Sequence, residues 1–264
     1  MQLLRLAFAA ALLGGTAPAV AAIQAQPVEW TQDEATFSGV LVHDDAGPAS
    51  RPGLVMVPNW MGITPAAVER AKELAGQDYV VLVVDMYGKG VRPADSQDAA
   101  KVSAGVREDR PLMRRRIIKA VDVLRAQAGR VPLDPDRIAA VGFCFGGTTV
   151  LELARSGSDV AAVVSLHGGL TTPMPAGEGD VHAPMLVLNG ADDEGVTAED
   201  IAGFAREMDA AGADWTFVNF SGAVHCFAEP EADSPPNCVY NERAAGRAYR
   251  MLDGFLREAM GNRD

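Results

Sequence analysis

The chain has 264 residues, of which 48% are hydrophobic and 22% are charged, and its formal net charge is −12. This acidity argues against a nucleic-acid partner, because binding to phosphates needs a basic surface. The length suits one α/β domain, and the apolar content is sufficient for a sheet that is buried on both faces.

The N-terminal segment is typical of a secretory signal peptide. One early cation, Arg5, precedes an apolar run and small residues that end at Ala21-Ala22. Cleavage is expected after either alanine, and an uncleaved anchor is the less favoured alternative because the apolar run is short for a membrane span. We therefore predict a signal peptide at 1–22 and a single domain at 23–264. The mature protein is expected to be exported, to the periplasm in a Gram-negative host, without membrane contact.

Seven apolar runs rich in β-branched residues predict strands. The inner runs consist almost entirely of Val, Ile and Leu, as in parallel strands buried on both faces. The predicted strands are Thr36–His43, Gly53–Val57, Tyr79–Asp85, Arg137–Phe143, Val160–Leu166, Met185–Asn189 and Asp214–Phe220.

Helical patterns separate these strands. Thr64-Pro65 forms a capping pair, and Gly76 ends the helix that follows. Asp109 begins another helix, in which the run Arg114-Arg115-Arg116 is interpreted as a solvated face. The alternation of strands and helices predicts a doubly wound, mostly parallel α/β sheet flanked by helices. The other helical runs are Thr148–Arg155, Ala198–Gly212 and Tyr240–Met260.

The most informative motif is Gly142-Phe143-Cys144-Phe145-Gly146-Gly147, between a strand and a helix. Small residues around one reactive residue at such a junction form a nucleophile elbow. Cys144 would lie at a helix N-terminus, where the helix dipole favours a thiolate. The alternative interpretation of Cys144 is a buried core cysteine.

Two later strands are followed by residues that complete a triad. Asp192-Asp193 comes after one strand and His225 after the next. The order nucleophile, acid, histidine is that of α/β-hydrolases, in which the histidine moves the proton and the acid orients it. We favour Asp193 over Asp192, although aspartates also occur simply as turn residues.

An oxyanion hole needs two backbone N–H groups. One should belong to Phe145, the residue after the nucleophile. The other should come from the loop that begins at Pro58, which has no N–H, so the candidates are Asn59 and Trp60. We favour Trp60, whose ring is also a candidate for the pocket wall or for ordinary core packing.

The chain has three cysteines. If Cys144 is the nucleophile, export favours a disulfide between Cys226 and Cys238, and two free thiols are the alternative. The sequence contains no nucleotide-binding loop, and three of its four histidines lack metal-ligand spacing with Asp, Glu or Cys, so neither a cofactor nor a metal is expected.

The motifs resemble those of the dienelactone hydrolase family, within the α/β-hydrolase superfamily. The family elbow G-x-C-x-G-G matches 142–147, its acid segment G-x-x-D matches 190–193, and its histidine segment matches 222–227. Val84-Asp85-Met86-Tyr87-Gly88 is similar to the family's D-L-Y-G, and 133–138 to its lead-in to the elbow. The resemblance covers nearly all of the chain from about Val28 onward.

The resemblance implies two further residues, and this chain differs at both. Family members carry a glutamate that contacts the resting thiol, where this chain has Asn59, and an arginine four residues after the histidine, where it has Glu229. We therefore expect poor activity on carboxylated lactones. The pocket is predicted to include Asn59, Tyr87 and His167, the last because it ends a strand.

These features together predict a hydrolase of small esters or lactones that works through an acyl-thiol intermediate. A binding protein that keeps the fold and the pocket without turnover is the alternative. The expected partner is a small-molecule ester or lactone, and a monomer is the default state.

Overall fold

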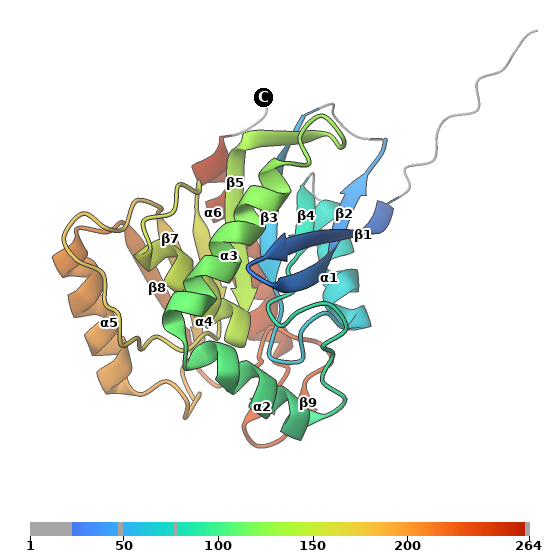
Figure 1. Ribbon diagram of the computed structural model, residues 1–264. Helices are drawn as coiled ribbons and strands as arrows, with labels where there is room; N and C mark the ends of the chain where they lie inside the picture. The colour runs from blue at the N-terminus through green and yellow to red at the C-terminus, as the bar shows by residue number, and fades with distance from the viewer. Residues whose placement is uncertain (1–22, 47–49, 77–78, 262–264) are drawn as a thin grey trace, which may run out of the picture.

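The computed structural model describes residues 23–46, 50–76 and 79–261, which form a central sheet with helices on both faces (Figure 1). The predicted signal peptide lies outside the described residues. Within them, eight strands form one sheet in the order β1-β2-β4-β3-β5-β6-β7-β8. The strands are β1 (Ile23–Gln32), β2 (Ala35–Asp44), β3 (Arg51–Val57), β4 (Val80–Val83), β5 (Leu133–Phe143), β6 (Val163–Leu166), β7 (Met185–Gly190) and β8 (Trp215–Phe220).

The sheet is mostly parallel, as the sequence predicts. β3 pairs in parallel with β4 and β5, and the parallel pairing continues through β6, β7 and β8. The antiparallel pairs of this sheet are the β1–β2 hairpin and β2 with β4. Because parallel strands end at the same edge, the loops after β3, β5, β6, β7 and β8 all leave from one edge of the sheet.

Helices cover both faces and define two cores. α1 and α6 pack on one face and α3, α4 and α5 on the other. Successive residues of β3 alternate between the two cores: Leu54 and Met56 belong to one, Val55 and Val57 to the other. The helices are α1 (Pro65–Ala75), α2 (Ser96–Arg107), α3 (Arg110–Arg125), α4 (Phe145–Arg155), α5 (Ala198–Ala211) and α6 (Glu242–Met260).

Two elements absent from the predicted set are β1 and α2. β1 is an edge strand in which only Trp30 is buried, and its Pro27 is tolerated because an edge strand need not donate every N–H. α2 buries only Ala99, Ser103 and Val106, which gives little hydrophobic periodicity. A short hairpin, β9 (Asp233–Ser234) with β10 (Cys238–Val239), also lies outside the prediction.

The arginine run of α3 differs from the expected solvated face. Arg114 donates through Nε to the buried carboxylate of Glu152 at 2.8 Å, and Arg116 donates to the Met86 carbonyl at 2.6 Å. Of the three arginines, only Arg115 is exposed. A run of charges in the sequence does not show whether a buried carboxylate or an unpaired carbonyl lies on a neighbouring segment. Here the Glu152 carboxylate and the Met86 carbonyl bind two of the three arginines, which therefore point inward.

A search for helices with the length and apolarity needed to cross a membrane found none in the described part of the chain.

Candidate active site

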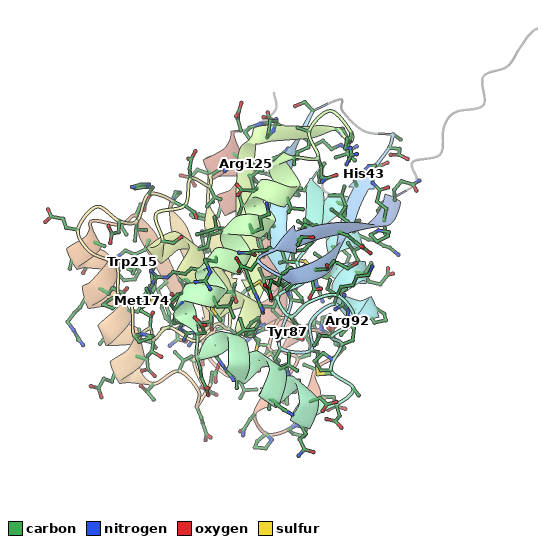
Figure 2. All side chains as sticks on the ribbon, viewed as in Figure 1. His43, Tyr87, Arg92, Arg125, Met174 and Trp215 are labelled. Carbon is green, nitrogen blue, oxygen red and sulfur yellow. A yellow bond between two sulfur atoms is a disulfide. The ribbon has the colours of Figure 1, made fainter. Side chains whose placement is uncertain are left out.

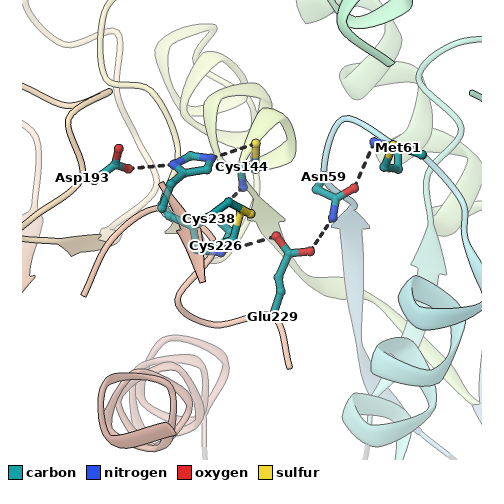
Figure 3. The surroundings of a disulfide bond; sticks show 9 residues. Asn59, Met61, Cys144, Asp193, Cys226, Glu229 and Cys238 are labelled. Carbon is teal, nitrogen blue, oxygen red and sulfur yellow. Dashed lines mark hydrogen bonds and ion pairs between the residues drawn. A yellow bond between two sulfur atoms is a disulfide. The ribbon is translucent and has the colours of Figure 1, made fainter. Parts of the chain in front are cut away.

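The tight turn between β5 and α4 holds Cys144 at the carboxyl edge of the sheet (Figure 3). Cys144 has a φ of 54°, a left-handed value that is uncommon for residues other than glycine. The glycines on either side allow the backbones to approach. A Cβ on Gly146 would lie 2.0 Å from the Val57 carbonyl oxygen, and one on Gly142 would lie 2.1 Å from the Gly146 carbonyl oxygen.

Three side chains from three different loops form a continuous chain of contacts. The Cys144 sulfur lies 3.1 Å from Nε2 of His225, and Nδ1 of His225 lies 2.7 Å from Oδ2 of Asp193. Asp193 is 6% exposed, and its other oxygen accepts the Gly195 N–H at 2.8 Å. Asp192 is exposed instead. The arrangement therefore joins the thiol to Asp193, the acid favoured from the sequence, through one imidazole.

The hydrogen bonds among these three side chains favour the charged form of the His225 imidazole. Burial alone would lower the pKa of His225, but the hydrogen bonds to Asp193 and Cys144 outweigh it and raise that pKa to about 10. An imidazolium next to a cysteine stabilises the thiolate, which is the nucleophilic form. The His225 ring is thus held at both of its nitrogens, by Asp193 on one side and Cys144 on the other.

The loop after β3 lies beside the nucleophile and is braced at several points. The Asn59 side-chain oxygen accepts the Met61 N–H at 3.0 Å, and the Asn59 carbonyl accepts the Gly62 N–H at 2.9 Å. Tyr87 donates its hydroxyl to the Trp60 carbonyl at 2.8 Å. Phe145 is the first residue of α4, so its N–H has no acceptor within the helix. Trp60 and Cys144 line the same cavity, and Phe145 follows Cys144 directly in the chain, so both predicted oxyanion donors belong to segments next to Cys144.

Glu229 is a buried carboxylate in the wall of the site. It is 6% exposed, and one of its oxygens accepts a hydrogen bond from the Asn59 side-chain nitrogen. Burial raises the pKa of Glu229 to about 7, against the opposing effect of the Asn59 hydrogen bond. Asn59 and Glu229, which occupy the two positions where the chain differs from the family pattern, thus bind each other across the cavity (Figure 3).

Two cavities meet at the nucleophile, and both are lined by Cys144, His225 and Arg107. The larger, of about 400 Å³, is also lined by Asn59, Trp60, Glu229, Glu231, Asp233 and both cysteines of the histidine loop. The smaller, of about 290 Å³, extends toward α4 and is lined by Phe145, Thr148 and Val196 among others. Cys144 is therefore open to a cavity on each of two sides.

Two of the predicted pocket residues do not line these cavities. His167 is completely buried, behind the elbow instead of on the pocket floor. The end of a strand predicts the correct edge of the sheet, but it does not predict on which side of the nucleophile a side chain lies. Tyr87, labelled in Figure 2, is 9% exposed; its ring packs against Phe145 with centroids 5.5 Å apart, and its hydroxyl holds the loop after β3 at the Trp60 carbonyl.

Cys226 and Cys238 form a disulfide, with Cα atoms 5.0 Å apart, beside the histidine. Cys144 is the free cysteine of the described residues.

A search for clusters of three or more His, Cys, Asp or Glu side chains able to hold a metal ion found none among the residues that the structure describes.

Comparison with known proteins gives the family. The model of the dienelactone hydrolase family matches residues 37–260. The chain belongs to the dienelactone hydrolase family. Sequence resemblance and structure thus lead to the same family, and the protein is a hydrolase of esters or lactones.

The chain is similar to several known proteins over most of their length. A dienelactone hydrolase-like promiscuous phosphotriesterase from metagenomic libraries is 33% identical, with a TM-score of 0.83, and the match covers 91% of this chain and all (100%) of the other. A dienelactone hydrolase from Anabaena variabilis has a TM-score of 0.66 at 19% identity, covering 90% of this chain and 99% of that one. A Bradyrhizobium relative named "Probable 2-oxo-3-(5-oxofuran-2-ylidene)propanoate lactonase" is 27% identical, over 78% of this chain and 83% of its own.

Proposed function

We propose that this dienelactone hydrolase family member cleaves small esters or lactones with Cys144 as nucleophile, His225 as proton carrier and Asp193 as the acid that orients it. The observation that supports the proposal is the pair of contacts made by the imidazole. Its Nε2 lies 3.1 Å from the sulfur, and its Nδ1 lies 2.7 Å from the carboxylate. Each role follows from the chemistry that the group performs in a triad.

The reaction has two halves. The Cys144 thiolate adds to the carbonyl carbon, and the N–H groups of Phe145 and Trp60 stabilise the oxyanion. The oxyanion collapses, the C–O bond breaks, and the His225 imidazolium gives its proton to the departing alkoxide. Neutral His225 then takes a proton from water as the hydroxide adds to the acyl-thiol carbonyl. When the C–S bond breaks, the acid product leaves and the thiolate and imidazolium are restored.

The substrate class follows from the walls of the larger cavity. Glu229, Glu231 and Asp233 line it, and its basic lining residues are Arg107 and His225. Because three of its lining side chains are acidic and would repel an anionic substrate, we expect neutral esters and lactones to have the higher kcat/KM.

The decisive experiment is the acylation burst with p-nitrophenyl acetate. We expect a burst followed by turnover in the mature protein, and neither in Cys144→Ala or His225→Ala. Asp193→Asn should reduce kcat by about 10⁴, as the loss of the orienting acid does in a serine triad. Asp192→Asn is the matched control, because it removes an exposed neighbouring carboxylate. Full activity in Cys144→Ala would refute the proposal. The absence of a burst in the mature protein, with Cys144 shown to be reduced by a free-thiol assay, would favour the binding-protein alternative.

We also propose that the chain is exported. The carrying observation is the N-terminal order of cation, apolar run and small residues. When the gene is expressed in a Gram-negative host, the intact mass of the protein recovered from the periplasm should match a chain cleaved after Ala21 or Ala22. Full-length protein retained in the cytoplasm would contradict this.

A further inference from the structure

His167 is a fully buried histidine that the proposed reaction does not use. It follows β6 directly and has a left-handed φ of 41°, and its exposed fraction is 0%. Such a backbone is uncommon for a residue with a side chain, and it persists only where the surroundings enforce it. Gly168 shows how close those surroundings are, since a Cβ there would lie 2.5 Å from the backbone of Gly147 in the elbow helix.

The ring of His167 contacts the backbone of the nucleophile. The Cys144 N–H is shared between Nδ1 of His167, at 3.1 Å, and the Leu166 carbonyl, at 3.0 Å. A backbone N–H only donates, so Nδ1 must carry the lone pair. Burial, helped by the neighbouring His225, lowers the pKa of His167 well below its ordinary value. The ring is therefore neutral, and its single proton belongs on Nε2.

The protonated side of the ring faces Glu229. Nε2 lies 3.8 Å from Oε1 of Glu229, and within the described residues neither buried atom has a hydrogen-bond partner. A movement of about 1 Å would bring them into hydrogen-bonding distance. The other Glu229 oxygen is already held by Asn59. His167 thus lies between the nucleophile backbone and a carboxylate of the cavity wall.

The same ring also packs against the proton carrier. The His167 and His225 ring centroids are 5.2 Å apart with an edge-on angle of 70°, and Phe227 contacts His167 in a similar way at 5.5 Å. Asp193 holds one nitrogen of His225, and His167 limits the movement of that ring from another direction.

We propose that His167 is a positioning residue for this reaction. In its Nε2–H tautomer it holds the Cys144 backbone and the His225 ring in their reactive arrangement, with Glu229 as the carboxylate that faces its proton. The inference rests on the proposed nucleophilic role of Cys144 and extends it by a residue that touches no substrate. It predicts that kcat depends on a hydrogen-bond acceptor at the Nδ1 position, and not only on the volume of the ring.

Three variants separate these effects. His167→Asn keeps an acceptor near the Nδ1 position, His167→Leu fills space without one, and His167→Gly removes the acceptor while relaxing the left-handed backbone. With p-nitrophenyl acetate, we expect kcat to fall about tenfold or more in the Leu and Gly variants at nearly unchanged KM, as for one lost hydrogen bond in the reactive arrangement. The Asn variant should recover most of that loss. Thermal unfolding of each variant verifies that it is folded.

The result that overturns the proposal is wild-type kcat in the Leu and Gly variants, or an Asn variant as slow as they are. Should the Leu and Gly variants fail to fold, NMR of the ring nitrogens in isotope-labelled wild-type protein decides the question. His167 should stay in the neutral Nε2–H form between about pH 5 and pH 8. An Nδ1–H tautomer or an imidazolium at His167 would refute it.

The two proposals fail in different ways. Activity that survives Cys144→Ala refutes the nucleophile. A Cys144-dependent burst that does not respond to the His167 acceptor refutes only the positioning role.

Discussion

Two glycines allow Cys144 to occupy a backbone conformation that few residues adopt. The atoms that a Cβ at Gly142 or Gly146 would meet first are backbone atoms, which cannot swing aside as a flexible side chain can. Any side chain at these positions therefore has to displace the end of β3 or the start of α4. The elbow depends on these residues as much as on the cysteine itself.

Replacement of Gly146 by alanine should test this dependence. We expect Gly146→Ala to lower the free energy of unfolding by about 1–3 kcal/mol, the usual range for overpacking, and to abolish the acylation burst. Gly254→Ala in α6 is the control: its Cβ meets no atom within 4 Å, and alanine there should add about 0.5–1 kcal/mol through helix propensity. Chemical denaturation measures both. Wild-type stability and burst in Gly146→Ala would contradict the close approach.

The raised pKa of Glu229 makes a prediction about stability and pH. An acid with a folded-state pKa of about 7, above its ordinary 4.5, favours folding only while protonated, so its contribution is lost as the pH rises from 4.5 through 7. Glu229→Gln removes that ionisation. The stability difference, defined as the unfolding free energy of the variant minus that of wild type, should be larger at pH 8.5 than at pH 4. We expect the increase to be about 1–3 kcal/mol. An unchanged difference between the two pH values would contradict burial of the charge.

At the scale of elements, the inner strands were predictable because burial on both faces leaves continuous Val, Ile and Leu runs. The predicted strand at Gly53–Val57 is the core of β3, and Met185–Asn189 is β7 but for one residue. β6 is shorter than predicted, Val163–Leu166. Ala161 and Ala162 are apolar and form backbone hydrogen bonds with β5, but the regular strand pairing begins only at Val163. β1 and α2 bury too few side chains to leave a periodic signal.

The candidate site was predictable where it follows strand ends and not where it depends on loops. Cys144, Asp193 and His225 each come shortly after a strand of the parallel sheet, so topology alone brings them to one edge. The inward position of His167 and the contact between Asn59 and Glu229 depend on loop paths, and the second joins residues 170 positions apart. No local pattern encodes such a contact.

The disulfide joins the histidine loop to the segment before α6. β10 begins at Cys238, and its neighbour Val239 donates to the His225 carbonyl at 3.2 Å. The double variant Cys226→Ser/Cys238→Ser should lose about 2–3 kcal/mol of stability and part of kcat, because the loop carrying His225 is then held less firmly. Native, unreduced wild-type protein should take up one alkyl group, on Cys144. Uptake of three would show that the disulfide does not form in solution.

At the scale of the whole molecule, a net charge of −12 adds to the local effect of Glu229. Long-range repulsion slows the approach of anions and is screened by salt, whereas neutral molecules are unaffected. We expect kcat/KM for a carboxylated lactone to rise severalfold between low and physiological ionic strength. The value for its neutral methyl ester should stay constant. Equal salt dependence for the two substrates would contradict an electrostatic origin.

The disulfide-bounded loop also has a consequence for substrate choice. Between Cys226 and Cys238 the chain contributes Glu229, Glu231, Ala232, Asp233 and Ser234 to the cavity wall, and these residues all lie outside the central sheet. Because the covalent link fixes both ends, substitutions inside the loop can reshape the cavity with little disturbance of His225. Substitutions in this loop should therefore change which substrates the cavity accepts while the proposed reaction chemistry stays the same.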